Sequence, residues 1–591
     1  MDIELRPGAP AAFSRPTVCA AFQATLAAAS DDAVALRTKG DGVRITWREL
    51  GDRVKRYAGG FAALGVAPGD TVAMLMLNRP EFNIIDTAAI HVGAVPFSIY
   101  VTSTVEQIRY FLDDSGAKIA ITERAFAGKL REAAAGSKVE KIIVVDESLA
   151  DLETAPSGFD FEATWRAVRP DSLLTIIYTS GTTGMPKGVE LTHANIVVQL
   201  RMFQAARDIE PGARIISYLP HAHVADRMST HYMNMFVGGT VTTCPDPKQL
   251  FEHVPDVRPT EFTGVPRVWE KLKAGLEAKF AAEPPEKRAA IKGAIDASLM
   301  KVRAEQAGQP VPEPLAQGVA RAEQMVFAPL RAALGLDKTR SFFVGAAPTP
   351  REVLEFFHAL HIPIAEVWGM SELSCVATAM PRGVFKIGSV GKALPGVEIK
   401  IAGDGEVLVR GPLIMRGYRN KPDQTRETVV DGWLHTGDVG ELDAEGYLKL
   451  VDRKKELIIN AAGKNMSPAN IEARIKTSSP LIGQACVIGD GRAYNVALLV
   501  LDPDGAMAFC KARNIDLPLA KLVDHPDIKT EIERAIGAAN EHLSRVEQVK
   551  RIALLPDEWL PGGDELTPTM KLKRKPIAAK YAARIEALYS A

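Results

Sequence analysis

One lysine stands among glycines and hydroxyl residues in the stretch Tyr178-Thr179-Ser180-Gly181-Thr182-Thr183-Gly184-Met185-Pro186-Lys187-Gly188. Glycine lets backbone N–H groups approach an anion closely, hydroxyls donate hydrogen bonds to phosphate oxygens, and lysine adds a positive charge. In the common P-loop, Gly-Lys-Ser/Thr opens a helix, whereas here Pro186 precedes the lysine and Gly188 follows it. The stretch therefore predicts a phosphate-binding loop of another kind. The alternative is a flexible turn that joins two elements.

The segments around this stretch alternate between two patterns. Short apolar runs at 71–77, 118–122 and 174–177 are typical of strands. Runs from 46 to about 64, from 81 to 92 and from 105 to 112 are typical of helices, and another helix opens near Thr192. Alternation of this kind predicts a layered α/β domain with a largely parallel sheet.

The chain has 591 residues, which is too long for one core and indicates two or more domains. A change of composition near Asp452, followed by the basic run Arg453-Lys454-Lys455, separates a large multi-layered α/β domain at 1–451 from a small α+β domain at 452–591. The segment from about 281 to 340 is rich in Ala, Lys, Glu and Arg. It predicts inserted surface helices without chemistry.

Bulk composition excludes several classes of protein. The net charge of -1 gives no overall positive field for nucleic acid. Five widely spaced cysteines without a Cys-x-x-Cys pair argue against zinc and disulfide frameworks. We expect no signal peptide, because the N-terminus Met1-Asp2-Ile3-Glu4 is acidic and has no long apolar run. We expect no membrane span, because no apolar run reaches about 18 residues. A cytoplasmic protein is expected. Peripheral contact with the inner membrane surface and the oligomeric state, a homodimer included, stay open.

The order Thr-Ser-Gly-Thr-Thr-Gly-x-Pro-Lys-Gly resembles the signature of the adenylate-forming enzymes, which include acyl-CoA synthetases, luciferases and adenylation domains of peptide synthetases. Further motifs follow in the order of that family, between about Trp47 and Lys575. Val265-Pro266-Arg267 and the helical insertion after it are similar to the long-chain fatty acyl-CoA synthetase branch. The resemblance implies the adenylate-forming fold with a mobile C-terminal domain. It also implies activation of a fatty acid by ATP and transfer to CoA, with Mg²⁺ as cofactor.

By this resemblance, several residues would bind ATP. Thr179, Ser180, Gly181, Thr182, Thr183, Gly184 and Lys187 would hold the phosphates, and Gly345 would lie against the adenine. Glu366-Val367-Trp368-Gly369-Met370-Ser371-Glu372 is similar to the aromatic-Gly-x-Thr/Ser-Glu motif of the family, so Glu366, Val367, Trp368 and Gly369 would border the nucleotide. Ser371 would contact the phosphates, and Glu372 would hold Mg²⁺ together with Thr179. Tryptophan replaces the usual tyrosine at 368, which leaves a hydrogen bond from this position in doubt.

Two further motifs concern the ribose and the hinge. In Gly432-Trp433-Leu434-His435-Thr436-Gly437-Asp438, Asp438 would accept hydrogen bonds from both ribose hydroxyls. Arg453 would touch ribose or phosphate, and Lys455 matches the hinge between the domains. Gly463, Lys464 and Asn465 match the loop that lines the CoA channel.

Two residues would act at the reacting carboxylate. His223, in Leu219-Pro220-His221-Ala222-His223, would lie near it, although residue type alone equally suits a buried, hydrogen-bonded histidine. Met570-Lys571-Leu572-Lys573-Arg574-Lys575 aligns with the usual Gly-Lys-x-x-Arg-Lys, which puts the catalytic role on Lys571. Charge alone would also suit a solvated tail or a patch for anionic lipid.

Two other functions remain to be weighed. An acyl-AMP ligase that delivers the acyl group to a carrier protein shares the first step. A non-catalytic nucleotide or lipid binder could lose Lys571, Glu372 or Asp438, yet all three are present. The acyl chain length does not follow from the sequence.

Overall fold

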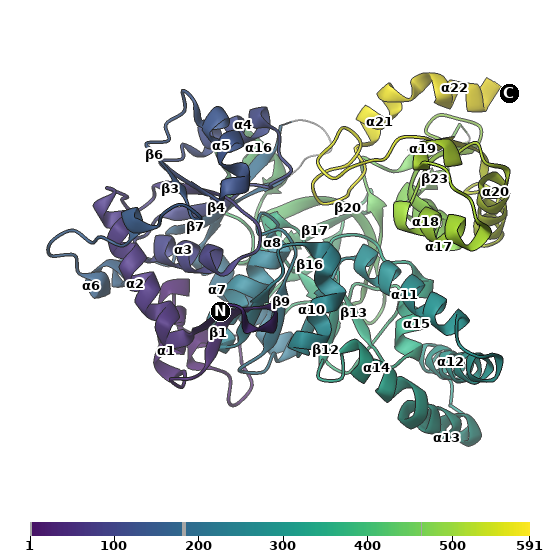
Figure 1. The fold of residues 1–591 in the computed structure, drawn as a ribbon, viewed down its shortest axis with the longest axis horizontal. Coiled ribbons are helices and arrows are strands. Elements are labelled where there is room, and N and C mark those ends of the chain that lie inside the picture. Colours follow the sequence, from purple (N-terminus) through teal and green to yellow (C-terminus); the bar gives the residue numbers. More distant parts are fainter. Residues whose placement is uncertain (1–2, 180–184, 462–463, 591) are drawn as a thin grey trace.

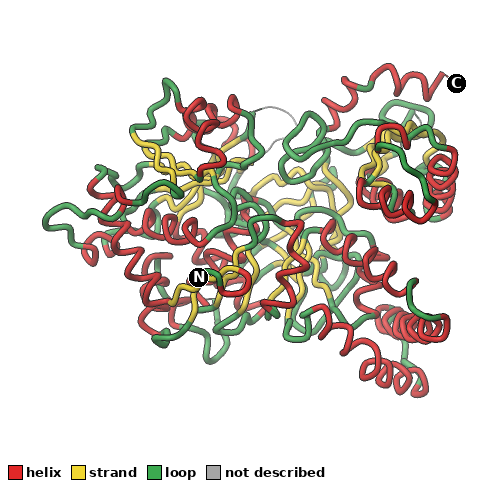
Figure 2. The backbone as a smooth tube through the Cα atoms, in the orientation of Figure 1, coloured by secondary structure: helices red, strands yellow, loops and turns green. Residues whose placement is uncertain are grey.

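The computed structural model describes residues 3–179, 185–461 and 464–590 (Figure 1). Ser180, Gly181, Thr182, Thr183, Gly184 and Gly463, for which roles were predicted, lie outside the described residues. Figure 2 shows strands gathered in the interior of the large N-terminal part, with helices over them. The predicted α/β class is confirmed.

The N-terminal part is built on three sheets in which parallel pairing dominates. The order β4-β3-β5-β6 is parallel throughout, β1-β10-β9 is parallel with β2 antiparallel at its edge, and β11-β12-β13 is parallel before β14 and β15. The strands are β1 Val34–Thr38, β2 Arg44–Thr46, β3 Thr71–Leu75, β4 Val95–Ser98, β5 Ile119–Thr122, β6 Lys141–Val144, β9 Arg214–Ser217, β10 Thr240–Thr243, β11 Glu261–Gly264, β12 Ser341–Val344, β13 Ile364–Trp368, β14 Thr378–Ala379 and β15 Lys392–Ala393.

Side-chain caps fix the starts of the helices that cover these sheets. Helix α2 (Trp47–Ala63) starts after Thr46, which forms a capping box with Glu49. Helices α4 (Val105–Ser115) and α7 (His193–Arg207) have the same arrangement at Thr104 and Thr192. Each box satisfies backbone N–H groups that the first helical turn leaves free, so the sequence itself sets where these helices begin. Helix α3 (Pro80–His91) begins instead with proline.

The segment from 281 to 340 is helical and projects from the body beside α15 (Arg351–Ala359) (Figure 1). It contains α12 (Pro285–Gln306), α13 (Glu313–Ala322) and α14 (Ala328–Leu334) and follows α11 (Pro266–Ala281). Buried Trp269 packs α11 against Phe262 and Phe357. In the described ranges, no helix is long and apolar enough to span a membrane.

Two further sheets of the large part are antiparallel. Strands β7 (Leu173–Thr179), β8 (Lys187–Thr192) and β18 (Gly417–Tyr418) form one sheet. A second sheet contains β16 Glu398–Ile401, β17 Glu406–Arg410, β19 Val429–Val430, β20 Trp433–Leu442 and β21 Leu448–Arg453. Residues 443–447 join β20 to β21 in an antiparallel hairpin.

The C-terminal part has its own sheet and its own apolar core. Strands β24 (Ile482–Ile488), β25 (Asn495–Leu501) and β26 (Val549–Leu555) pack against helices and bury a separate hydrophobic cluster. The helices are α17 Pro468–Ser478, α18 Pro503–Arg513, α19 Leu519–Leu522, α20 Pro526–Glu541, α21 Arg574–Lys580 and α22 Ala582–Ser590.

Ion pairs join the two parts at the surface. Arg267 at the start of α11 pairs with Asp502, which caps α18. One turn further along α11, Lys271 Nζ lies 3.0 Å from Asp504 Oδ2. Arg474 Nη1 on α17 lies 2.7 Å from Glu352 Oε1 on α15.

Candidate active site

Strands β7 and β8 hold the two ends of the phosphate-loop stretch. Thr179 is the cross-strand partner of Lys187, and its hydroxyl donates to the Lys187 carbonyl at 3.3 Å. From helix α4, the Tyr110 hydroxyl donates to the Pro186 carbonyl at 2.7 Å. Both ends of the loop are therefore fixed by hydrogen bonds.

Tyr418 links this loop to Glu372. Buried Glu372 lies in a 3₁₀ turn just after β13, and its Oε1 accepts a hydrogen bond from the Tyr418 hydroxyl at 2.8 Å. Lys187 Nζ lies 4.2 Å from the centroid of the Tyr418 ring. Burial lowers the pKa of Lys187, and the nearby Glu372 carboxylate opposes that shift. No motif in the sequence pointed to Tyr418.

The donors at this point suit a magnesium ion shared with ATP. Tyr418 occupies one oxygen of Glu372, and the Thr179 hydroxyl stands at the end of β7 beside Lys187. In the described part of the chain, no three His, Cys, Asp or Glu side chains gather as a metal cluster. Mg²⁺ commonly uses one or two carboxylates and takes its remaining ligands from substrate phosphates and water. One carboxylate and one hydroxyl therefore fit an ion that arrives with the nucleotide.

Side chains from two other strands contact Asp438 on β20, one through a hydrogen bond and one through an ion pair. The indole Nε1 of Trp368, the last residue of β13, donates to Asp438 Oδ2 at 2.8 Å. Arg453 is the cross-strand partner of Asp438 on β21, and its Nε lies 2.8 Å from Oδ1. The hydrogen bond that the sequence left in doubt at position 368 is thus present, directed to the carboxylate predicted to bind ribose.

Close backbone contacts explain the glycines beside this group. A Cβ added to Gly369 would lie 1.9 Å from the Cys375 carbonyl oxygen, so only glycine allows the turn that leads to Ser371 and Glu372. A Cβ at Gly345 would lie 3.0 Å from the Val367 carbonyl oxygen on the neighbouring strand. The protein backbone itself therefore requires small residues at both positions, before any nucleotide is considered.

Glu366 lies on β13 two residues before Trp368. Its Oε2 accepts a hydrogen bond from the Gly388 backbone N–H at 3.3 Å. Burial raises its pKa to about 7.

His223 caps the short helix that follows Leu219-Pro220. Its Nδ1 accepts a hydrogen bond from the Ala225 N–H at 3.1 Å, so in the neutral ring the proton is on Nε2. Burial and then the positive charge of Lys571 lower the pKa of His223 to about 4. Near neutral pH His223 is therefore an uncharged ring that presents an N–H donor.

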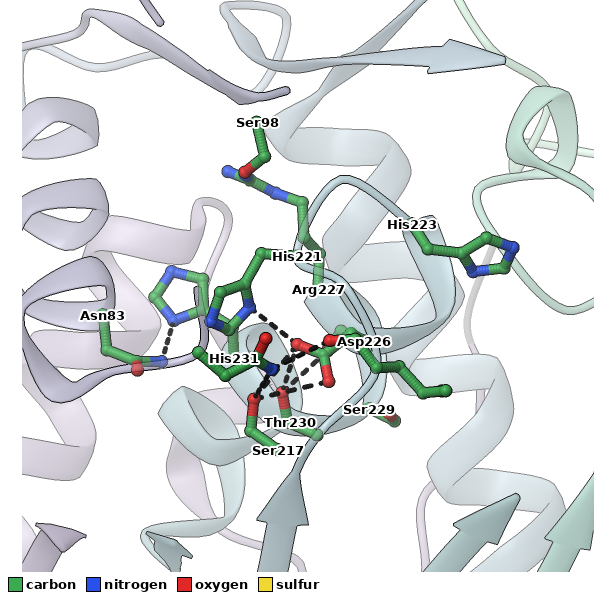
Figure 3. A network of polar contacts seen from close by, with 12 residues as sticks. Asn83, Ser98, Ser217, His221, His223, Asp226, Arg227, Ser229, Thr230 and His231 are labelled. Carbon is green, nitrogen blue, oxygen red and sulfur yellow. Dashed lines mark hydrogen bonds and ion pairs between the residues drawn. The ribbon is translucent and has the colours of Figure 1, made fainter. Parts of the chain in front are cut away.

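A buried polar network lies behind His223 (Figure 3). Asp86 pairs with Arg227 and, at 2.9 Å, with His231. His221 Nδ1 lies 2.7 Å from Asp226 Oδ2, off the direction of a hydrogen bond, and its ring stacks on Phe82. Figure 3 shows the His223 ring turned away from His221 and Asp226. The network thus shapes the element that carries His223, and it gives His221 a packing role.

Lys571 is presented by a tight loop of the C-terminal part. Its backbone N–H donates to Thr567 Oγ1 at 3.0 Å, and its carbonyl accepts from the Thr567 N–H at 2.8 Å. Met570, at the place of the family's glycine, has a φ of +65°, a conformation that glycine adopts at no steric cost. Three residues after Lys571, Arg574 Nη1 lies 2.6 Å from Oε1 of buried Glu472 on α17. The loop is therefore rigid within the C-terminal part.

The charges of several groups described above act on Lys571. Its side chain is exposed, yet the surrounding protein and then the Arg453 guanidinium lower its pKa, while Asp438 and Glu372 oppose the shift. Because the side chain keeps contact with solvent, its loss of hydration is partial. The charges of Asp438 and Glu372 in the N-terminal part therefore act on Lys571 of the C-terminal part.

The predicted hinge and channel residues lie at the junction. Exposed Lys455 occupies the turn between β21 and β22 (Ile458–Ile459), and its charge contributes to lowering the pKa of Lys187. The Lys464 N–H donates to Asn460 Oδ1 at 2.9 Å, and Asn465 pairs with Ile459 through β23 (Asn465–Met466).

Comparison with known families matches residues 22–419 to the AMP-binding enzyme and residues 455–591 to the AMP-binding enzyme C-terminal domain. The chain belongs to the AMP-binding enzyme family. The family predicted from the sequence motifs is therefore confirmed, with both segments in the expected order.

Named relatives of this AMP-binding enzyme are ligases. A Mycobacterium tuberculosis protein named as fatty-acid–CoA ligase fadD11 is 52% identical over 447 residues, which cover 75% of this chain and 78% of that protein. The long-chain-fatty-acid–CoA ligase FadD15 of Mycobacterium bovis is 36% identical and covers 92% of both chains. The o-succinylbenzoate CoA synthetase of Bacillus subtilis, solved with its acyl-adenylate intermediate, has a TM-score of 0.69 at 24% identity. It covers 94% of this chain and 97% of its own, and supports the adenylate-forming fold.

Proposed function

We propose that this AMP-binding enzyme is an AMP-forming fatty acid–CoA ligase. The observation that supports this best is the pair of buried carboxylates, Glu372 held by Tyr418 and Asp438 held by Trp368, whose charges also act on Lys571. The names of the relatives favour a fatty acid as substrate and CoA as acceptor over delivery to a carrier protein.

In the first step, a carboxylate oxygen of the acid would attack the α-phosphorus of ATP, and the bond to pyrophosphate would break. Both reactants are anions, so cations must offset their repulsion. Lys187 would act at the phosphates, Arg453 at ribose or phosphate, and Lys571 at the carboxylate, where they stabilise the charge of the transition state. A magnesium ion at Glu372 and Thr179 would supply Lewis-acid stabilisation of the phosphate oxygens. The neutral His223 would donate its Nε2 proton in a hydrogen bond to the acyl group.

In the second step, the CoA thiolate would attack the acyl carbonyl, and AMP would leave with the electron pair of the cleaved bond. Lys571 and the CoA-channel residues Gly463, Lys464 and Asn465 would use the same space in turn. We propose that the part from 452 to 591 rotates about Lys455 between the steps. The arrangement described above, with Lys571 beside Asp438, would serve the first step.

The test is a pyrophosphate-release screen over saturated fatty acids of increasing chain length, with and without CoA. We expect release that depends on a fatty acid, and formation of acyl-CoA when CoA is added. Turnover with a carrier protein but not with CoA would favour the acyl-AMP ligase alternative. Absence of release with every fatty acid would overturn the proposed function.

A further inference from the structure

Trp368 occupies the position where the family has an aromatic residue beside the nucleotide, but its indole N–H donates to Asp438. The side chain is only 6% exposed and packs with Leu373, Leu394 and Val407 in an apolar cluster. Little of the ring remains open, but its one polar atom lies 2.8 Å from Asp438 Oδ2. The indole N–H is thus the part of Trp368 that reaches the ribose carboxylate.

The carboxylate of Asp438 is held from two sides. Trp368 occupies one acceptor position on Oδ2 with a hydrogen bond, and the Arg453 guanidinium lies 2.8 Å from Oδ1 as an ion pair. An ionised carboxylate has about four acceptor positions, two on each oxygen. At least one position on each oxygen therefore stays available, and two hydroxyls on neighbouring carbons of a ribose need two acceptors.

We propose that Trp368 is a positioning residue that makes the enzyme select ribonucleotides, because its N–H orients Asp438 toward the 2′- and 3′-hydroxyls of ATP. This inference rests on the proposed function. The turn after Trp368 supports a fixed placement, because the Cys375 carbonyl admits only glycine at 369 and so holds the end of β13 in one position. Arg453 fixes the other oxygen from β21.

The experiment compares ATP, 2′-deoxy-ATP and 3′-deoxy-ATP as substrates for acyl-adenylate formation. Trp368→Phe keeps an aromatic ring and removes the N–H. A hydrogen bond to a charged group is strong enough that its loss should lower kcat/KM for ATP by about 10-fold. For the deoxynucleotide that lacks the affected hydroxyl, kcat/KM should fall by no more than about 2-fold. The ratio of kcat/KM for ATP to that for this deoxynucleotide should therefore decrease.

Controls separate positioning from packing. Trp165→Phe removes another buried indole, whose N–H has no hydrogen-bond partner in the described part of the chain, and should leave the nucleotide preference unchanged. Replacing Trp368 by 3-benzothienylalanine keeps the bicyclic shape without the N–H, and serves if Trp368→Phe fails to fold. In an Asp438→Ala background, Trp368→Phe should not change the preference further.

The outcomes are distinct. Equal loss with all three nucleotides, or no loss with any, would overturn the positioning role. If the wild-type protein releases no pyrophosphate with any acid, the proposed function fails instead. Calorimetric binding of AMP and 2′-deoxy-AMP still tests the selection of ribose in that case.

Discussion

Glu372 and Asp438 are buried, and each carboxylate is held by a side chain from another strand, whereas Lys571 stands exposed on a loop of the C-terminal part. Asp438 lies on β20, and Glu372 lies in the turn that follows β13, so strands of the N-terminal part carry or position both carboxylates. Lys571 reaches them from a part with its own core. Under the proposed function, the site would therefore join buried carboxylates that bind the nucleotide to a lysine from a separately folded part.

This difference indicates how one site could serve two reactions. Groups that bind the nucleotide are needed in both steps, and burial keeps them in place. A lysine needed in one step only can be withdrawn if it belongs to a part attached through a turn and surface ion pairs. Because Thr567 and the Arg574–Glu472 pair make its loop rigid, Lys571 should move with the whole C-terminal part.

Of the variants considered, Lys571→Ala should change the rates of the two half-reactions most unequally. Loss of its charge at the carboxylate should slow acyl-AMP formation by about 100-fold or more and spare thioester formation from supplied acyl-AMP. The measurement is the rate of each half-reaction in a single turnover. Lys575→Ala, four residues further on and also exposed, is the matched control. Equal loss of rate in both half-reactions would show that Lys571 is needed in both steps and would contradict its role in the first step alone.

Glu372→Gln tests whether this buried carboxylate binds magnesium. The amide can still accept the Tyr418 hydrogen bond but binds a divalent cation more weakly, so the magnesium needed for half-maximal rate should rise by about 10-fold. Titration of pyrophosphate release with Mg²⁺ measures this shift, and Glu398→Gln on β16 is the control. An unchanged titration would place the metal carboxylate elsewhere.

Lys455→Pro tests the connection between the two sides. Proline fixes φ near about −65°, so a rotation about this residue would be blocked. Acyl-AMP formation should stay close to wild type, while transfer to CoA should slow by about 10-fold. Lys455→Ala removes the same charge and keeps the backbone free, and should transfer normally. Normal transfer in a folded Lys455→Pro variant would exclude this hinge.

The ion pairs between the two parts should matter least. Exposed pairs contribute about 0–1 kcal/mol, so Arg474→Gln, which breaks the contact with Glu352, should change the ratio of the two half-reaction rates by only about 2-fold. Raising the salt concentration should mimic the variant, because salt screens exposed charges. Arg534→Gln breaks a pair inside α20 and should not change the ratio. A change of ten-fold or more in this ratio would contradict the small contribution expected of an exposed ion pair.

Local signals in the sequence predicted much of the fold. The helix expected from 46 to about 64 is α2 (Trp47–Ala63), because the capping box at Thr46 and Glu49 is contained within four residues. Strands at 71–77 and 118–122 were expected for the same local reason, and β3 and β5 lie there. The motifs also named Glu372, Asp438 and Lys571 as site residues.

Contacts between distant residues were out of reach. Tyr418 is 46 positions from Glu372, Trp368 is 70 from Asp438, and Arg267 is 235 from Asp502. No spacing within a helix or strand relates such pairs, so only the folded chain reveals them. The buried Asp86–Arg227–His231 network behind His223 was missed for the same reason.

The most direct test of the proposed domain rotation is to cross-link the C-terminal part to the N-terminal part in the arrangement described above. Lys271→Cys on α11 and Asp504→Cys on α18 replace an exposed ion pair whose charged atoms lie 3.0 Å apart, and a short bis-maleimide can join the two thiols. The native cysteines are buried or partly buried, and single-cysteine variants control for their reaction. The cross-linked protein should form acyl-AMP at the uncross-linked rate and fail to pass the acyl group to CoA. Equal rates of acyl-CoA formation with and without the cross-link would contradict the account.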